Sequence, residues 1–362
     1  MREVYLDMQR SRLDHYFLDN PSLQKRYKKI KKHVNRLIIS GYDITNRCNL
    51  RCKGCYFFEG ERSSRFNDDR TLEEFDAFFA SEVKRGVNMP HFAGAEPAKV
   101  PDRLALAAKY WNRGVIYTNG TLPIARDLPF MLHISLWGTE ETDARLRGKH
   151  AFRRALENFS HDARAVFIFT INRQNLGEMV EVTDICAQHG TKLSFNHYSP
   201  THWYGSAGTE MPNEIRFRGK GRFSGPNDQL ALRLEDLNII KDHIQELLIR
   251  YPDTLIYSSY YNERINSPDV LFNIDSQTGV ATNCAILNSV HHREYRTDLT
   301  WDDADCCIPN TNCATCRHYV ANYSKIMGDF HHHLDSVIQF EQWLEVYDTW
   351  CRLNIRSWDT LD

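Results

Sequence analysis

Three cysteines lie close together near the start of this chain, Cys48, Cys52 and Cys55, and Tyr56 directly follows the third. Cysteine thiolates bind the irons of iron–sulfur clusters, and a [4Fe–4S] cube needs four ligands if the protein alone is to coordinate it. The C-x3-C-x2-C spacing therefore predicts a cube with three coordinated irons and a fourth iron that is open to a ligand which is also a substrate. A zinc site that lacks its fourth ligand and cysteines without a metal are the alternatives, although zinc motifs usually come as paired C-x2-C units.

Short polar motifs follow at the ends of apolar segments further along the chain. They are A-G-A-E-P at 93–97, Y-T-N-G-T at 117–121, I-S-L-W-G at 134–138, R-G at 147–148, T-I-N-R at 170–173 and F-N-H-Y-S at 195–199. Each motif alone is more often a turn than a binding site. Their order and spacing behind the three cysteines make the set informative.

Together the cysteines and these motifs resemble the radical S-adenosylmethionine (radical SAM) superfamily over roughly residues 36–200. A-G-A-E-P is similar to the family's GGEP motif, with Ala95 in place of the second glycine, and in the family this turn meets the SAM amino group. The arginine of R-G resembles one that meets the SAM carboxylate, whereas Trp137 departs from the acid usual in S-L-D-G. The resemblance implies cofactor contacts at Gly94, Glu96, Pro97, Thr118, Asn119, Ser135, Arg147, Thr170, Asn172 and Asn196.

The resemblance also implies the chemistry. SAM would bind the open iron through its amino and carboxylate groups, and one electron from the reduced cluster would break its S–C5′ bond. The resulting 5′-deoxyadenosyl radical abstracts hydrogen from an unactivated C–H bond, so the cofactor supplies the difficult step and the protein positions the substrate. An electron donor such as flavodoxin or ferredoxin is implied as a partner. The sequence assigns no catalytic side chain.

A second group of cysteines lies toward the C-terminus: Cys284, Cys306, Cys307, Cys313 and Cys316. Gly279-x4-Cys284 followed by Cys313-x2-Cys316 resembles the C-terminal extensions called SPASM or twitch domains, which hold auxiliary iron–sulfur clusters. This implies a second [4Fe–4S] cluster on Cys284, Cys307, Cys313 and Cys316, with Cys306 spare or in place of Cys307. A similar tail occurs in enzymes resembling the hopanoid adenosyltransferase, and a zinc site or thiols without a metal stay open as alternatives.

The remaining metal-ligand residue types favour structural roles. Cys186 and Cys351 lie in helical patterns with apolar neighbours, which predicts small core residues. The run 331–333 is three adjacent histidines, and adjacent side chains on a helix point in different directions, which disfavours a metal site.

Short apolar segments alternate with helix-like segments between residues 36 and 200. Strands are expected at 36–44, 89–93, 114–118, 131–136, 165–171 and 192–196. Helices are expected at 71–85, 101–112, 140–159 and 176–189. This alternation predicts an α/β fold with a parallel sheet of βα units, a partial (β/α)6 barrel whose working residues lie at the carboxyl ends of the strands.

Three parts of the chain are therefore expected. Residues 1–35 form an N-terminal helical segment, 36–200 the radical SAM core, and 201–362 a cap and a C-terminal extension that bears the auxiliary cysteines. Within the last part the sequence predicts a loop at 202–227, a helix at 229–250, a strand at 254–259, an irregular segment at 272–316 and a helical tail.

Composition excludes several classes of partner. Lys+Arg 45 against Asp+Glu 47 gives a net charge of −2, so no overall field attracts nucleic acid or anionic lipid. The basic stretch 25–32 is expected to be a solvated helix face. No apolar run reaches the length of a membrane span and the N-terminus is too charged for a secretory signal, so a cytoplasmic protein is expected.

The substrate is the least constrained feature. Polar and aromatic side chains that a cap would present to it are His197, Tyr198, His202, Trp203, Tyr204, Arg216, Arg218 and Arg222. A small polar metabolite, such as a sugar, nucleoside or amino-acid derivative, is the leading expectation. A maturase acting on a ribosomally made peptide is the alternative, and an iron–sulfur protein for electron transfer or sensing ranks last.

Overall fold

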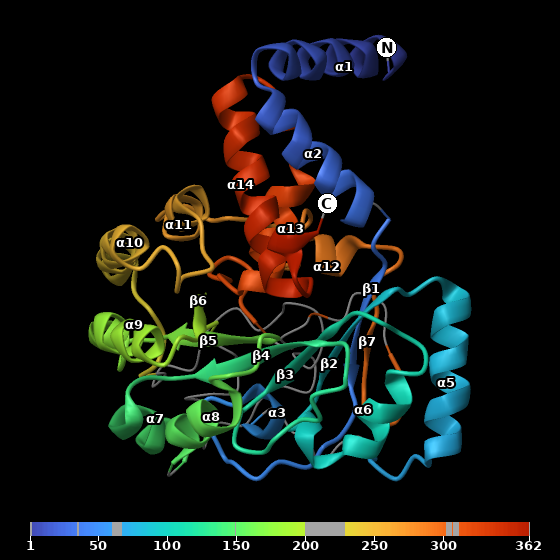
Figure 1. Ribbon diagram of the computed structural model, residues 1–362, viewed down its shortest axis with the longest axis vertical. Coiled ribbons are helices and arrows are strands. Elements are labelled where there is room, and N and C mark those ends of the chain that lie inside the picture. Colours follow the sequence, from blue (N-terminus) through green and yellow to red (C-terminus); the bar gives the residue numbers. More distant parts are fainter. Residues whose placement is uncertain are drawn as a thin grey trace.

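The computed structural model describes residues 2–34, 36–59, 67–148, 150–199, 229–301, 306 and 311–361. At its centre lies a seven-stranded sheet in the order β6-β5-β4-β3-β2-β1-β7, and every neighbouring pair is parallel (Figure 1). The strands are β1 (Ile39–Asp43), β2 (Met89–Ala93), β3 (Val115–Thr118), β4 (Met131–Leu136), β5 (Ala165–Ile171), β6 (Lys192–His197) and β7 (Glu294–Tyr295).

The six expected strands of the core are confirmed, and β2, β4 and β5 have the expected bounds. All seven residues of β5 are buried, as expected for a parallel strand that is covered on both faces. The seventh strand was not expected. Residues Glu294 and Tyr295 come from the C-terminal extension and pair with Gly41 and Tyr42 of β1.

Helices cover the outer face of the curved sheet (Figure 1). They are α5 (Leu72–Arg85), α6 (Pro101–Ala107), α7 (Glu140–Leu146), α8 (Ala151–Phe159) and α9 (Met179–Gln188). α5 begins at a capping box between Thr71 and Glu74 and ends at Gly86, which is left-handed, so its sequence signals define both ends. The continuous helix expected at 140–159 is wrong, because Gly148 and His150 take positive φ angles and divide it into α7 and α8.

The two chain ends pack together on one side of the sheet (Figure 1). The helices there are α1 (Arg2–Asp19), α2 (Pro21–Val34), α10 (Leu234–Arg250), α11 (Ser259–Ile265), α12 (Ala285–Asn288), α13 (Tyr319–Gly328) and α14 (Val337–Asn354). Arg26 of α2 is bound to Asp348 of α14 at 2.8 Å. The strand expected at 254–259 is wrong, because within that segment only Leu255 makes a bridge to the sheet. The segment 272–316 is less irregular than expected, since it contains α12 and β7.

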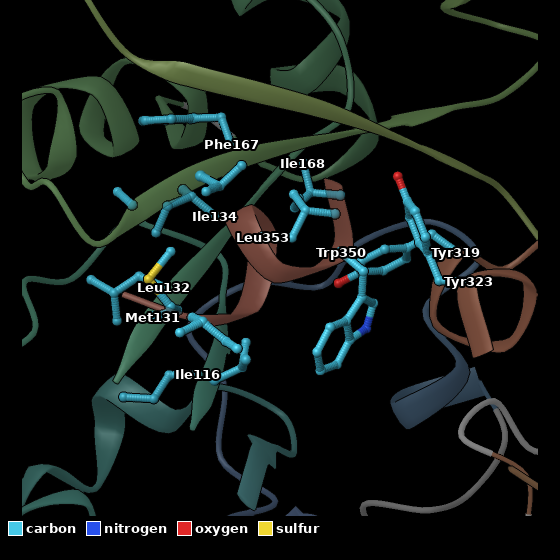
Figure 2. Packing of buried hydrophobic residues seen from close by; sticks show 14 of the residues in the cluster. Ile116, Met131, Leu132, Ile134, Phe167, Ile168, Tyr319, Tyr323, Trp350 and Leu353 are labelled. Atoms are coloured by element: carbon cyan, nitrogen blue, oxygen red, sulfur yellow. The ribbon is translucent and has the colours of Figure 1, made fainter. Parts of the chain in front are cut away.

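One cluster of buried residues joins this helical layer to the sheet (Figure 2). Trp350 and Leu353 of α14 and Tyr319 of α13 belong to the same cluster as Ile134 of β4 and Ile168 of β5. The C-terminal helices therefore close one end of the barrel. The expected loop 202–227 lies outside the described residues, and no described helix has the length and apolarity that crossing a membrane requires.

Candidate functional site

A cavity of about 290 Å³ lies at the carboxyl ends of the core strands. Its lining brings the three N-terminal cysteines together with most of the expected cofactor contacts, namely Cys48, Cys52, Cys55, Gly94, Glu96, Thr118, Asn119, Ser135, Arg147, Thr170 and Asn196. These residues lie at or just after the carboxyl ends of six different strands, and the carboxyl ends of parallel strands meet at one edge of a sheet. The topology therefore assembles one site from motifs spread over about 150 residues of sequence.

The three cysteines lie in the loop after β1, before the short helix α3 (Tyr56–Glu59). The backbone amide of Leu50 lies 3.3 Å and the side-chain amide of Asn119 lies 3.7 Å from Cys48 Sγ, and both donate to it. Burial raises the pKa of Cys52 to about 12, against the opposing charge of Arg147. An iron ligand must be a thiolate, so the donors at Cys48 and the cation beside Cys52 fit a bound cluster.

Glu96 links two of the loops rather than standing alone in the cavity. Its Oε1 accepts hydrogen bonds from Thr118 Oγ1 at 2.6 Å and Ala98 N at 3.0 Å, and its Oε2 accepts one from Asn119 N at 2.7 Å. Burial raises the pKa of Glu96, although these hydrogen bonds oppose the shift. The carboxylate thus fixes the A-G-A-E-P turn against the T-N-G turn while it lines the cavity.

Gly94 is required by geometry. Its φ is +117°, and a Cβ on it would lie 2.5 Å from the carbonyl oxygen of Thr45. Ala95, which replaces a family glycine, has no positive φ, and its amide donates to the same Thr45 oxygen at 2.8 Å. The substitution at position 95 therefore leaves the turn intact.

Arg147 ties the ends of two strands to α7. Its Nη1 donates to the carbonyl oxygen of Ser135 at 2.6 Å and to Asp143 Oδ2 at 2.9 Å, and its Nη2 donates to the carbonyl oxygen of Asn119 at 2.9 Å. The side chains of Arg147 and Asp143 are 1% and 0% exposed. The guanidinium is a buried positive charge at the cavity wall with a fixed orientation.

Two of the expected cofactor contacts do not line the cavity. Pro97 is the first residue of a 3-10 helix, and Asn172 is fully buried in a turn where its Oδ1 accepts from the Gln174 amide at 2.9 Å. Both positions hold the shape of loops beside the cavity, and direct contact between them and a cofactor stays a prediction.

The sequence analysis missed a second polar layer deeper in the same cavity. Its lining residues are His91, Tyr117, His133, His292, Glu294, His318 and Tyr319. The available signal was a polar residue inside an apolar strand, as His91 is in β2 and His133 in β4. The contributions of β7 and α13 had no sequence signal of this kind.

The C-terminal cysteines form a separate group. Cys284, Cys313 and Cys316 are buried beside Phe272 and other apolar residues, and Cys306 is close enough for its charge to raise the pKa of all three thiols, after the larger effect of burial. Cys307 lies outside the described residues.

No three histidine, cysteine, aspartate or glutamate side chains in the described parts of the chain converge closely enough to bind a single metal ion. The ligands of a [4Fe–4S] cube bind separate irons, so cluster cysteines need not converge in that way.

Two cysteines and one histidine that were expected to have structural roles are buried in the protein. Cys186 and Cys351 are fully buried, which confirms their prediction as core residues. Of the three adjacent histidines, His333 is buried, and its ring nitrogens bond the hydroxyl of Tyr260 and the carbonyl oxygen of Asp329.

Comparison with known proteins finds one family and one curated relative. Residues 42–185 match the sequence profile described as the radical SAM superfamily. The Fe-coproporphyrin III synthase of Methanosarcina barkeri (strain Fusaro / DSM 804) is 29% identical over 216 residues, which cover 55% of this chain and 52% of that protein. The chain thus spans about half the length of the curated relative that it matches.

Solved structures of anSMEcpe with bound AdoMet align at a TM-score of 0.49 and 14% identity, over 84% of this chain and 83% of theirs for the histidine-tagged protein. The same protein with bound AdoMet and the Kp18Cys peptide aligns at 0.48 and 15%.

A [4Fe–4S] cluster and SAM are the cofactors of the superfamily, and the three thiols with their N–H donors and the polar lining of the cavity fit them. The profile match covers the three cysteines and the motifs that follow them up to residue 173. Residues 42–185 of this chain therefore match the radical SAM superfamily, as the cysteine spacing and the motifs behind it predicted.

Proposed function

We propose that this chain is an enzyme that cleaves SAM reductively and uses the resulting radical to abstract hydrogen from a small polar metabolite. The observation that carries the proposal is the single cavity shared by Cys48, Cys52, Cys55 and the polar ends of five further strands. A cluster with an open iron and a cofactor with polar termini would be held on the same wall.

The chain's own residues prepare this site. Cys48, Cys52 and Cys55 would hold the cluster, and the Arg147 guanidinium favours the thiolate form of Cys52. Glu96 and Gly94 set the close approach of the loop after β2, since a side chain at position 94 would displace Thr45. When bound, the reduced cluster and SAM supply a 5′-deoxyadenosyl radical. Apolar side chains such as Phe57 and Ile168 share the lining and would limit water around that radical.

The test of SAM cleavage is anaerobic reconstitution followed by addition of SAM and dithionite. Formation of 5′-deoxyadenosine in the wild type but not in Cys52→Ala is expected. Cys186→Ala is the matched control, because Cys186 is a buried core thiol that does not line the cavity. Equal product in wild type and Cys52→Ala would contradict the proposal.

A second cluster is proposed on the C-terminal cysteines. The proximity of Cys284, Cys313 and Cys316 supports it, and Cys306 lies near them. The fourth ligand proposed is Cys307, as expected from the sequence, with Cys306 in its place as the alternative. About eight irons per chain in the wild type, and about four in Cys313→Ser, are expected from two cubes. About four irons in both proteins would contradict the second cluster.

A tetrapyrrole is the second candidate substrate, because the curated relative is a Fe-coproporphyrin III synthase. Incubation of the reconstituted protein with SAM, dithionite and Fe-coproporphyrin III separates the two candidates. A new porphyrin product would replace the metabolite proposal, and an unchanged porphyrin would leave the metabolite proposal in place. An electron donor such as flavodoxin or ferredoxin would take the place of dithionite in the cell.

A further inference from the structure

The cavity has a deep end, which we define by His91, Tyr117, His133, His292, Glu294, His318 and Tyr319. His91 of β2 pairs in register with Gly41 of β1, and Gly41 pairs with Glu294 of β7. Gly41 precedes the last residue of β1 by two positions, so this row lies roughly 6–7 Å below the strand ends. The deep end is thus one side-chain layer beneath the level at which the cluster loop leaves the sheet.

Two of its histidines have both ring nitrogens engaged. His133 Nε2 lies 2.9 Å from the carbonyl oxygen of Leu353, which only accepts, so His133 Nδ1 accepts from the Tyr319 hydroxyl at 2.7 Å. His292 faces two acceptors, the carbonyl oxygen of Ile39 at 3.1 Å and Glu294 Oε1 at 2.8 Å. His292 is therefore an imidazolium paired with the Glu294 carboxylate, and Glu294 raises its pKa although burial opposes the shift.

His91 differs from these two histidines. It is 7% exposed, its Nδ1 lies 3.0 Å from the Tyr117 hydroxyl, and its Nε2 is buried without a hydrogen-bond partner. Burial, with smaller effects of His133 and His292, lowers the pKa of His91 to about 3, so the ring is neutral. A phenol is a better donor than an imidazole N–H, and an imidazole nitrogen is a better acceptor than a phenol oxygen. We therefore assign Tyr117 as the donor to Nδ1 and place the proton of His91 on Nε2.

A buried donor without an acceptor is unfavourable, and the His91 ring lines the cavity in which the reaction is proposed to occur. We infer that His91 Nε2–H donates a hydrogen bond to an oxygen of the substrate, either a carboxylate or a carbonyl oxygen. The inference rests on the proposed function and names the class of group that the substrate places at the deep end.

The charges at the deep end also favour a substrate group with a carboxylate or carbonyl oxygen. The one cation there, His292, is balanced by Glu294, so an ammonium group would meet a donor and an imidazolium with no uncompensated carboxylate among the residues that define this end. A carboxylate or carbonyl oxygen instead receives the His91 proton. The site should therefore discriminate against amines of the same length and shape.

The test uses the cluster-reconstituted protein with SAM and three probes of equal chain length, butyrate, butyramide and butylammonium. Saturation-transfer NMR reports the binding of such weak ligands directly. We expect signals for butyrate and butyramide at least threefold above butylammonium, and a loss of at least threefold in His91→Leu. His91→Gln keeps an N–H donor and should retain the signals, and His161→Leu, the same change at an exposed histidine, should not alter them.

The two oxygen sources give different results. Butyrate well above butyramide would show that the site selects a carboxylate, and equal signals would show that a carbonyl oxygen suffices. Equal signals in wild type and His91→Leu, or a butylammonium signal as strong as the butyrate signal, would overturn the inference. A bound water would then be the acceptor of the His91 Nε2–H hydrogen bond.

Unfolding midpoints and the yield of 5′-deoxyadenosine separate loss of probe binding from misfolding and from loss of SAM cleavage. Matching unfolding midpoints exclude misfolding of His91→Leu, and if they differ, the ratio of the butyrate signal to the butylammonium signal in the wild type decides alone. Formation of 5′-deoxyadenosine without any His91 effect would reject this inference alone, whereas His91-dependent probe binding without 5′-deoxyadenosine would reject the proposed function alone.

Discussion

Arg147 was expected to contact SAM, and in the structure it also stabilises the fold. The resemblance implied contact with the SAM carboxylate, but its guanidinium already donates to Ser135, Asn119 and Asp143. It therefore holds the ends of β3 and β4 in place and presents a fixed positive charge to the cavity.

Replacing Arg147 by Met should destabilise the protein by about 3–5 kcal/mol, because the buried Asp143 carboxylate loses its only ion-pair partner in the described structure. Urea unfolding of the purified variant measures this. Arg153→Met is the control, since Arg153 and its partner Glu157 are more than half exposed and such pairs contribute little. Equal losses in the two variants would contradict this account of Arg147.

The residue types at the cavity rim were predictable from the sequence because Cys48, Glu96 and Asn119 belong to short motifs. His91 was not predictable, because a histidine in an apolar strand is usually a satisfied core residue and only the structure shows that its Nε2 lacks a partner. The hydrogen bonds of Arg147 go to three acceptors, two backbone carbonyl oxygens and one carboxylate, which lie on different elements. No local sequence pattern indicates these three acceptors.

At the scale of elements, the loops after the strands are held by backbone geometry as much as by side chains. The loop after β2 crosses the loop after β1 so closely that only a hydrogen fits on the Gly94 Cα on the side of Thr45. This crossing fixes where the cluster loop begins.

Gly94→Ala should lower stability by about 1–3 kcal/mol from its φ of +117° alone, and should reduce the yield of 5′-deoxyadenosine because Thr45 must move. Urea unfolding and the SAM-cleavage assay measure the two effects. Gly177→Ala should change neither, since a Cβ there meets no atom within 4 Å. Wild-type stability in Gly94→Ala would show that the crossing is not tight.

The strand β7 attaches the C-terminal extension to the edge of the sheet. Glu82 of α5 accepts from the hydroxyls of Tyr42 at 2.7 Å and Tyr295 at 2.8 Å and pairs with Arg85 at 2.6 Å. These buried groups bind β1, β7 and α5 to one carboxylate.

Tyr295→Phe should cost about 1.5–3 kcal/mol, the range for a hydrogen bond to a charged group, and should speed amide exchange in β7. Hydrogen exchange and urea unfolding check this. Tyr110→Phe removes a hydroxyl that donates to Asp76 at an exposed site and should have little effect. Unchanged exchange in β7 of Tyr295→Phe would contradict the role of Glu82 as its anchor.

Elements of the core were predictable where periodicity and caps agreed, as at β4, β5 and α5. β7 was not predictable, because two residues carry no strand pattern and their pairing partner lies about 250 positions away. The break between α7 and α8 depends on backbone angles at Gly148 and His150 that the helical pattern did not indicate.

At the scale of the molecule, burial of neutral histidines makes stability depend on pH. Burial lowers the pKa of His133 and of His197 to about 4, against about 6.5 in an unfolded chain. Between these values the unfolded state binds more protons, so stability is full above about pH 6.5 and falls as pH drops toward 4.

His197→Gln should reduce the pH dependence of unfolding between pH 6.5 and 5 by about 1 kcal/mol per pH unit. A fully titrating group contributes about 1.4 kcal/mol per pH unit, and His197 is only half protonated at pH 6.5 in the unfolded chain. Its amide can still donate to Asn266 Oδ1, which His197 Nε2 reaches at 2.7 Å. Urea unfolding at several pH values measures the slope, and the other buried histidines contribute equally to both proteins. Parallel pH profiles would contradict the neutral, buried state of His197.

The architecture as a whole was predictable to the extent that six βα units dictate a parallel sheet with its site at the strand ends. Closure of the barrel was not predictable, because α13 and α14 pack through a dispersed cluster that includes Tyr319, Trp350 and Leu353. That closure supplies the Tyr319 hydroxyl and the Leu353 carbonyl oxygen to His133 and so shapes the deep end of the cavity.

The proposed function requires that one iron beside Cys48, Cys52 and Cys55 has no ligand from the protein and is open to SAM. The most direct measurement is electron–nuclear double resonance on the reduced, reconstituted protein with SAM labelled by 15N in the amino group and 17O in the carboxylate. We expect hyperfine coupling of both labels to the cluster and no such coupling in Cys52→Ala. A reduced cluster that binds SAM without coupling to either label would contradict the proposed function.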